Sequence, residues 1–115
     1  MIYIASPYSH KDPNVMHNRY EKVKGFTAAC MREGLNVYSP IVHGHAIAES
    51  HDLPTDWQFW KDQCLSMLRV ADRMIVLQMN GYKESVGVRA EIEFCEMAGI
   101  PVSYSAFIDT WSFPE

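Results

Sequence analysis

The sequence predicts a single α/β domain, residues 1–115, built on a doubly wound parallel sheet. Short apolar runs typical of buried strands alternate with helix-compatible segments along the chain. A chain of 115 residues has room for one domain with one core. Crossovers between parallel strands are right-handed, and the first and third expected strands are almost wholly apolar. We therefore expect the strand order 2-1-3-4 in a Rossmann-like or flavodoxin-like sheet with helices on both faces.

The first part of the chain predicts a strand, a helix and a second strand. Residues 1–5 are fully apolar, which favours a central strand. Asp12 followed by Pro13 is typical of a helix start, and this helix should reach about Arg32. Residues 35–38 alternate in character, which indicates an edge strand.

Residues 41–54 are expected to be a long connection rich in histidine. Long loops in a small domain are often functional, and this one contains His43, His45 and His51. A zinc site usually combines such histidines with cysteine or acidic ligands at defined spacing. Only two acidic residues stand nearby, so we expect no metal here and no cofactor elsewhere.

The second part predicts two helices and two more strands. Thr55 with Gln58 three residues later fits a capping box, so a helix should follow and reach about Ala71. Residues 73–79 form an apolar run that predicts the third strand. Residues 100–104 predict the fourth strand, near an edge because a proline stands at its beginning.

The segment between the third strand and the last helix is the strongest candidate for a site. Asn80-Gly81 breaks the chain after the strand, and Ser85 can cap a helix over residues 86–98. In the order 2-1-3-4, this loop lies beside the loop at residues 6–12, at the switch point of the sheet. A ligand should bind between the two loops, where a helix N-terminus also favours an anion.

Glu91 stands at an unexpected position in this last helix. At helical spacing it shares a row with Val88 and Cys95, which is otherwise small or apolar. Glu93, two residues on, is about 200° further around the helix. An acid near a helix N-terminus also suits the helix dipole, which is an alternative explanation for Glu91.

Composition limits the classes of function. The chain is 48% hydrophobic and 21% charged, as in ordinary soluble globular proteins. Its net charge of −4 and lack of a basic run argue against binding of extended nucleic acid. The chain has three cysteines, Cys30, Cys64 and Cys95, and no two of them form a CxxC pair. An odd number of cysteines without this motif favours a reduced, cytoplasmic protein. We find no signal peptide and no run long enough to span a membrane.

Two stretches resemble the nucleoside 2-deoxyribosyltransferase superfamily. Residues 1–8, Met-Ile-Tyr-Ile-Ala-Ser-Pro-Tyr, resemble its opening motif, a strand followed by a turn of small residues. Gly81 and then residues 85–91, Ser-Val-Gly-Val-Arg-Ala-Glu, resemble its second motif, which leads to the catalytic Glu. The resemblance covers nearly the whole chain in order. It is closest to a short bacterial and phage branch related to the nucleoside 5′-monophosphate N-hydrolases.

The resemblance implies roles for several residues. Glu91 would be the nucleophile that attacks C1′ of the sugar, expels the base and forms a glycosyl-enzyme. Tyr3 matches a family tyrosine near the sugar and the nucleophile. Ser6, Pro7 and Tyr8 would shape the pocket for base and sugar, although a plain turn between strand and helix also explains them.

Ser85 distinguishes two subclasses of the superfamily. Enzymes that act on free nucleosides tend to have an Asp there, which binds the 5′-hydroxyl, whereas the monophosphate hydrolases have a Ser. Together with the Ser hydroxyl, the backbone N–H groups of Val86 and Gly87 suit a phosphate, which an Asp would repel. The alternative is that Ser85 only caps the helix. Gly81 belongs to the same substrate loop.

Cys64 departs from the family pattern. At the position of Cys64, in the helix expected after Thr55, family members usually have an Asp that helps to protonate the leaving base. Asp62 stands two residues earlier, so its side chain should point about 200° around the helix from that position. Cys64 could pack as a small hydrophobe while His43 or His45 acts as the acid. His43 follows the second strand, where relatives often bring a polar group toward the substrate. Otherwise the leaving group needs little protonation, or the protein binds nucleotides and turns them over poorly.

Three hypotheses follow. The first is an enzyme that cleaves the N-glycosidic bond of a (deoxy)nucleoside 5′-monophosphate, by hydrolysis or by base transfer, through Glu91. The second is a non-catalytic nucleotide-binding protein of the same fold, and the third is a metal-binding domain. Relatives often complete their active sites with a neighbouring subunit, and an apolar tail favours a homodimer or higher oligomer. The apolar residues of the tail are Phe107, Ile108, Trp111 and Phe113.

Overall fold

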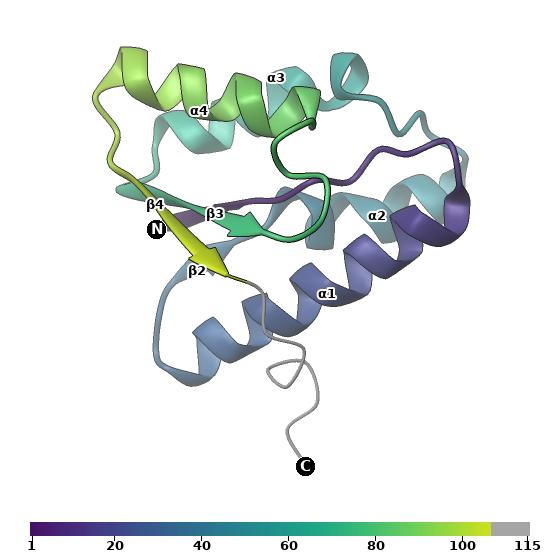
Figure 1. The fold of residues 1–115 in the computed structure, drawn as a ribbon, viewed down its shortest axis with the longest axis horizontal. Helices are drawn as coiled ribbons and strands as arrows, with labels where there is room; N and C mark the ends of the chain where they lie inside the picture. The colour runs from purple at the N-terminus through teal and green to yellow at the C-terminus, as the bar shows by residue number, and fades with distance from the viewer. Residues whose placement is uncertain (107–115) are drawn as a thin grey trace.

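Four parallel strands form one sheet in the order β2-β1-β3-β4. The structure is a computed structural model and describes residues 1–106. β1 (Ile2–Ala5) and β3 (Arg73–Gln78) lie in the centre, whereas β2 (Val37–Tyr38) and β4 (Val102–Ala106) lie at the edges (Figure 1). The predicted doubly wound parallel sheet and its strand order are confirmed.

Two pairs of helices cover the two faces of the sheet. α1 (Pro13–Arg32) and α2 (Pro40–His51) pack on one face (Figure 1). α3 (Trp57–Arg69) and α4 (Val86–Ala98) pack on the other face. The prediction of helices on both faces is therefore confirmed. Within residues 1–106, none of the helices combines the length and apolar character needed to cross a bilayer.

The side chains of β1 alternate between two cores. Ile2 and Ile4 belong to the core under α1, whereas Tyr3 and Ala5 belong to the core under α3 and α4. Successive side chains of a strand point to opposite faces, so a central strand needs apolar residues at every position. Tyr3 is fully buried and brings a hydroxyl group into the second core, toward α4.

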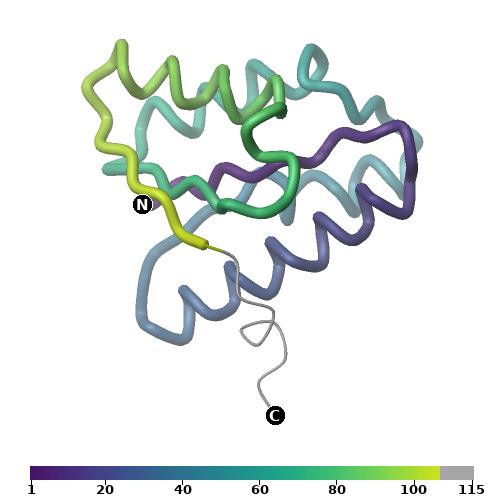
Figure 2. The backbone as a smooth tube through the Cα atoms, viewed as in Figure 1, coloured from purple at the N-terminus to yellow at the C-terminus, as the bar shows by residue number. Residues whose placement is uncertain are grey.

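Capping side chains begin α1 and α4 as the sequence predicts. Asp12 accepts a hydrogen bond from the N–H of Asn14, and Ser85 accepts one from the N–H of Val88. Gly99 ends α4 in the left-handed region, with φ of 75°. α1 follows β1 after the loop of residues 6–12, and α4 follows β3 after the loop of residues 79–85, as the trace of the chain in Figure 2 shows.

The predicted long connection over residues 41–54 is wrong, because α2 occupies most of it. Ser39 accepts a hydrogen bond from the N–H of Val42 and so caps this helix. Pro40 takes the first helical position, where a missing N–H costs nothing. Asp52 ends the helix in the left-handed region, with φ of 55°. The helix therefore begins only two residues after the end of β2.

The predicted capping box at Thr55 is also wrong. α3 begins at Trp57, and the side chain of the preceding Asp56 makes no capping hydrogen bond. The carbonyl of Thr55 instead accepts a hydrogen bond from the hydroxyl of Ser9. The segment before α3 is therefore fastened to the loop after β1. α3 ends at Arg69, before the predicted end of the helix.

The edge strands differ from the prediction at their ends. β2 contains two residues and begins at Val37 rather than at residue 35. β4 begins at Val102, because Pro101 has no N–H for the ladder and contributes only its carbonyl, to the N–H of Met74. The four apolar side chains of the predicted tail lie outside the described residues, so the oligomer that they suggest stays a prediction.

Candidate active site

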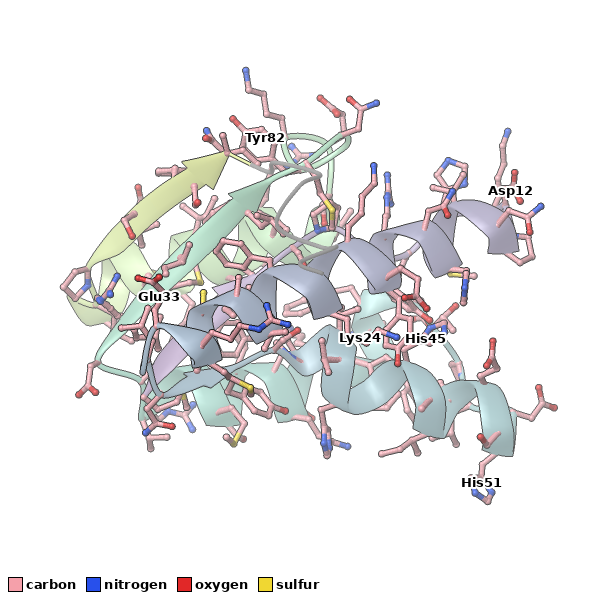
Figure 3. All side chains as sticks on the ribbon, turned by 90° about the horizontal axis from the view of Figure 1, so that it is seen from below. Asp12, Lys24, Glu33, His45, His51 and Tyr82 are labelled. Atoms are coloured by element: carbon pink, nitrogen blue, oxygen red, sulfur yellow. The ribbon has the colours of Figure 1, made fainter. Side chains whose placement is uncertain are left out.

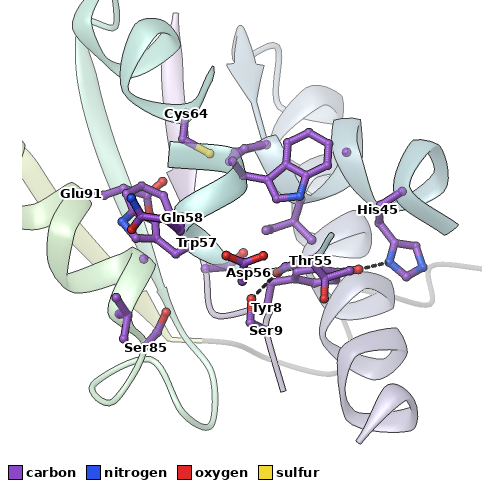
Figure 4. A pocket seen from close by; sticks show the side chains of 18 of the residues that line it. Tyr8, Ser9, His45, Thr55, Asp56, Trp57, Gln58, Cys64, Ser85 and Glu91 are labelled. Atoms are coloured by element: carbon purple, nitrogen blue, oxygen red, sulfur yellow. Dashed lines mark hydrogen bonds between the residues drawn. The ribbon is translucent and has the colours of Figure 1, made fainter. Parts of the chain in front are cut away.

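A cavity of about 480 Å³ lies at the switch point between β1 and β3. Residues of the loop after β1, of α2, of the start of α3 and of the N-terminal end of α4 form its wall (Figure 4). Its size is in the range of pockets for small ligands. The predicted location of the ligand site therefore coincides with a cavity.

Glu91 forms part of the cavity wall although its side chain is only 4% exposed. It lies in the second turn of α4 and shares the buried row of that helix with Val88 and Cys95. Glu93 is exposed, as predicted from its place around the helix. A buried carboxyl group is costly unless it is hydrogen-bonded, so the partner of Glu91 is important.

Tyr3 is the partner of Glu91. Its hydroxyl donates a hydrogen bond to Oε2 of Glu91 from the neighbouring β1. Burial and the charge of Glu91 hold the pKa of Tyr3 well above its usual range, so the hydroxyl stays a donor. Tyr3 is not part of the cavity wall and supports Glu91 from behind.

Burial has a larger effect on the ionisation of Glu91 than the N-terminus of α4. Burial raises the pKa of Glu91 to about 8, and the hydrogen bond from Tyr3 offsets this only in part. The helix dipole acts mainly within the first turn, whereas Glu91 lies in the second turn. At pH 7 the carboxyl group is mainly protonated, and it becomes a carboxylate as the pH rises through about 8.

Cys64 of α3 lies in the cavity wall beside Glu91 (Figure 4). Burial, and then the charge of Glu91, raise the pKa of this thiol to about 12, against a smaller opposing effect of Tyr3. The group therefore keeps its proton at neutral pH and is a weak acid. Among the three explanations for Cys64, packing as a small buried hydrophobe fits this environment.

Ser85 and Gly87 bring the N-terminus of α4 to the cavity wall, as predicted. A Cβ on Gly87 would lie 3.0 Å from the ring of Trp57, and a Cβ on Gly44 would lie 3.3 Å from the ring of Trp60. Both tryptophans line the cavity. The two glycines therefore allow flat aromatic walls to pack directly against α4 and α2.

Ser6 and Tyr8 also reach the cavity, whereas Pro7 between them is buried outside its wall. The hydroxyl oxygen of Ser6 is buried and has no hydrogen-bond partner among the described residues. An unsatisfied buried hydroxyl costs free energy, which a polar ligand in the cavity would recover. The hydroxyl of Tyr8 lies 2.7 Å from Nδ1 of His45.

His45 and not His43 faces the cavity. His45 is 8% exposed and stacks on Tyr20 with 4.0 Å between ring centroids. Burial lowers the pKa of His45, so its imidazole is neutral at pH 7. Figure 4 shows His45 and Tyr8 at the end of the cavity away from Glu91. His43 is exposed and is not part of the wall.

Gly81 is not part of the cavity wall and instead makes room for the side chain of Arg19. Its φ is 93°, and the guanidinium group of Arg19 occupies the space that a Cβ would need. Arg19 also donates hydrogen bonds to the carbonyls of Tyr8 and Ser9. Arg19 therefore joins the loop after β3 to the loop after β1, and Gly81 makes room for it.

The aromatic walls of the cavity, Trp57 and Trp60, were not predicted from the sequence. The available signal was Gly44 and Gly87, because a glycine inside a helix often marks a close approach by another group. The contribution of Arg19 had no comparable signal.

A family model described as "Domain of unknown function (DUF1937)" matches residues 1–106. These residues contain every strand and helix described above and the whole cavity wall. No curated protein matches the chain.

Glu91→Gln should change how stability depends on pH. The folded state holds a proton on Glu91 up to about pH 8, whereas the unfolded state loses it near its ordinary pKa. This contribution to stability is fully present below the unfolded pKa and is lost as the pH rises through about 8. Urea unfolding from about pH 5 to 8 should show a decline of roughly 3–5 kcal/mol in the wild type, which Glu91→Gln abolishes.

Glu93→Gln is the matched control for this measurement. It removes an exposed carboxyl group from the same helix and should keep the decline of the wild type. An equal decline in the wild type and in Glu91→Gln would show that Glu91 has no raised pKa.

Proposed function

We propose that this chain, which belongs to the family described as "Domain of unknown function (DUF1937)", cleaves the N-glycosidic bond of a (deoxy)nucleoside 5′-monophosphate. The observation that carries the proposal is the pair of Tyr3 and Glu91, a buried carboxyl group at a cavity wall with one hydroxyl donor behind it. Buried carboxyl groups with strongly shifted pKa values in clefts are typical of functional sites. The resemblance to the nucleoside 2-deoxyribosyltransferase superfamily supplies the role of nucleophile.

In the first step the carboxylate of Glu91 attacks C1′ of the sugar, and the bond from C1′ to the base nitrogen breaks. The base leaves with the bonding electron pair, and an ester between Glu91 and C1′ remains. Water then hydrolyses the ester and gives the sugar phosphate. In the net reaction this water supplies the hydroxyl on C1′ and the proton on the base. A second base in place of water would give transfer instead.

The cavity wall offers different groups for the base and for the phosphate of a nucleotide. Trp57, Trp60 and Tyr8 offer aromatic surfaces for a flat base. Ser85 and the first turn of α4 offer a hydroxyl group and a helix N-terminus for the phosphate. The hydroxyl of Ser6, which has no partner among the described residues, is a further group for the sugar or the base.

A non-catalytic nucleotide-binding protein is the second candidate function. Glu91 is mainly protonated at neutral pH, and the thiol of Cys64 stands where relatives have an acid. Both observations favour binding without turnover at pH 7. The pKa of Glu91 also predicts that an active enzyme works better near pH 8, where Glu91 is ionised.

The setting of the proposed enzyme follows from the cysteines and the resemblance. Cys30, Cys64 and Cys95 are free and buried, which supports a reducing compartment such as the cytoplasm. Relatives often complete the active site with a neighbouring subunit, so a homodimer or higher oligomer is part of the proposal. The substrate is a small molecule, and no cofactor is required for the steps above.

A product assay tests the proposed reaction. The wild type and Glu91→Gln are incubated with ribo- and deoxynucleosides and their 5′-monophosphates, and released bases are separated by chromatography. The wild type should release base faster near pH 8 than near pH 7, because the pKa of Glu91 is about 8. Glu91→Gln should lose roughly a thousandfold or more of kcat/KM.

Glu93→Gln is the control for this assay, since it removes a carboxyl group from the exposed side of α4. It should keep the wild-type rate. Thermal stabilisation by a nucleotide without base release at either pH would favour the binding protein instead.

Ser85→Asp tests the assignment of the phosphate. Asp caps a helix as well as Ser does, so α4 should remain folded. Its charge would repel a phosphate, and kcat/KM for monophosphates should fall at least about tenfold while that for nucleosides is retained. Ser85→Asn caps equally well without a charge and should keep the preference of the wild type. An unchanged preference in Ser85→Asp would remove the phosphate from this end of the cavity.

A further inference from the structure

One nitrogen of the His45 imidazole, Nε2, has no role in the site described above. Nδ1 contacts the hydroxyl of Tyr8 at 2.7 Å, which leaves Nε2 on the opposite side of the ring. Nε2 is buried and makes no hydrogen bond within residues 1–106, and His45 as a whole is only 8% exposed. A buried polar atom without a partner costs free energy, so Nε2 is suited to an added ligand.

Two further residues with donor groups lie close to His45. His17 comes from α1, and Glu49 follows His45 by one turn on α2. One ligand atom from each of the three residues lies within 4.8 Å of the others. Oε2 of Glu49 is 3.7 Å from Nε2 of His45, which is too long for a hydrogen bond.

We propose that His17, His45 and Glu49 bind a first-row divalent cation, of which Zn²⁺ is the best fit, between α1 and α2. Zn²⁺ binds imidazole and carboxylate donors at about 2.0–2.2 Å, so donors around one ion lie about 3–4 Å apart. The separation of His45 and Glu49 is already in this range. His17 and Glu49 are exposed, and rotation of their side chains can close the remaining distance.

The donor set and its surroundings agree with this class of metal. Two imidazoles and one carboxylate suit Zn²⁺ and its neighbours, and water completes the coordination. A histidine that binds a metal through one nitrogen usually has its other nitrogen held by a polar group, as Tyr8 holds Nδ1 of His45. With Nε2 on the metal, Nδ1 carries the proton and donates to Tyr8, whose own O–H then points elsewhere.

The charges around the site also permit a cation. Oε2 of Glu21 lies 3.5 Å from Nε2 of His17 and adds a second carboxylate at the rim. Lys24 stands close to His45 between the two helices (Figure 3) and opposes a cation. Its ammonium group is paired with Glu21 at 3.0 Å and lies over the ring of Tyr20. Glu21 therefore offsets Lys24, and Glu49 supplies the charge that binds the metal.

The sequence predicts no metal site when only residues close to His43, His45 and His51 along the chain are considered as ligands. The structure adds two facts. The segment is a helix, which puts His45 and Glu49 on one face at the spacing of one turn, and α1 packs beside it with His17. This inference does not rest on the proposed reaction.

Titration of the metal-free full-length chain with Zn²⁺ tests the proposal. Binding is followed by calorimetry and by thermal stability, and Co²⁺ serves as a probe because its visible absorption reports the ligand geometry. The wild type should bind one equivalent with a Kd of about micromolar or tighter. His17→Ala and Glu49→Gln should each weaken binding at least about tenfold. Both residues are exposed, so these variants should keep the fold.

His51→Ala is the matched control, because His51 is an exposed histidine at the far end of α2 from His45 (Figure 3). It should bind Zn²⁺ like the wild type. Absence of binding by the wild type at micromolar Zn²⁺ would overturn the proposal. So would binding that is equally tight in His17→Ala and in the wild type, because the metal would then bind at other side chains.

Discussion

The hydrogen bond from Tyr3 to Glu91 is the contact on which the rest of the site depends. It requires a central strand that turns its second residue, Tyr3, toward α4 and a helix that turns a carboxyl group toward the strand. Both side chains are buried, so each polar group needs a hydrogen-bond partner within the protein. The same burial that makes the hydrogen bond necessary also raises the pKa of Glu91 to about 8. Burial is therefore the physical cause both of the Tyr3–Glu91 contact and of the shifted pKa of Glu91.

The cavity in front of this pair is held open by contacts between distant segments. Arg19 joins the loops after β1 and β3 through the carbonyls of Tyr8 and Ser9 and the bare backbone of Gly81. Gly87 allows the ring of Trp57 to pack against α4. Loops that are fastened in this way present a preformed site, which reduces the entropy lost when a ligand binds.

The sequence predicted the parts of the molecule that depend on local pattern. Alternation of apolar runs with helical segments was enough for the sheet and its order, and the row of Val88 and Cys95 was enough to place Glu91 inside. The helix α2 was missed because it begins at Pro40, directly after the second strand and its cap Ser39, and because its histidines suggested a loop. The pairing of His45 with Tyr8 and with His17 depends on how α2 packs on the rest, which no local pattern carries.

The most direct test of the central claim is the covalent intermediate itself. The protein is mixed with its best monophosphate substrate near pH 8, stopped with acid within one turnover and digested for mass spectrometry. The account predicts that the peptide containing Glu91 gains the mass of one sugar phosphate residue, and that this gain disappears in Glu91→Gln. Release of base with the added mass on another side chain, or with no added mass at any time point, would contradict Glu91 as the nucleophile.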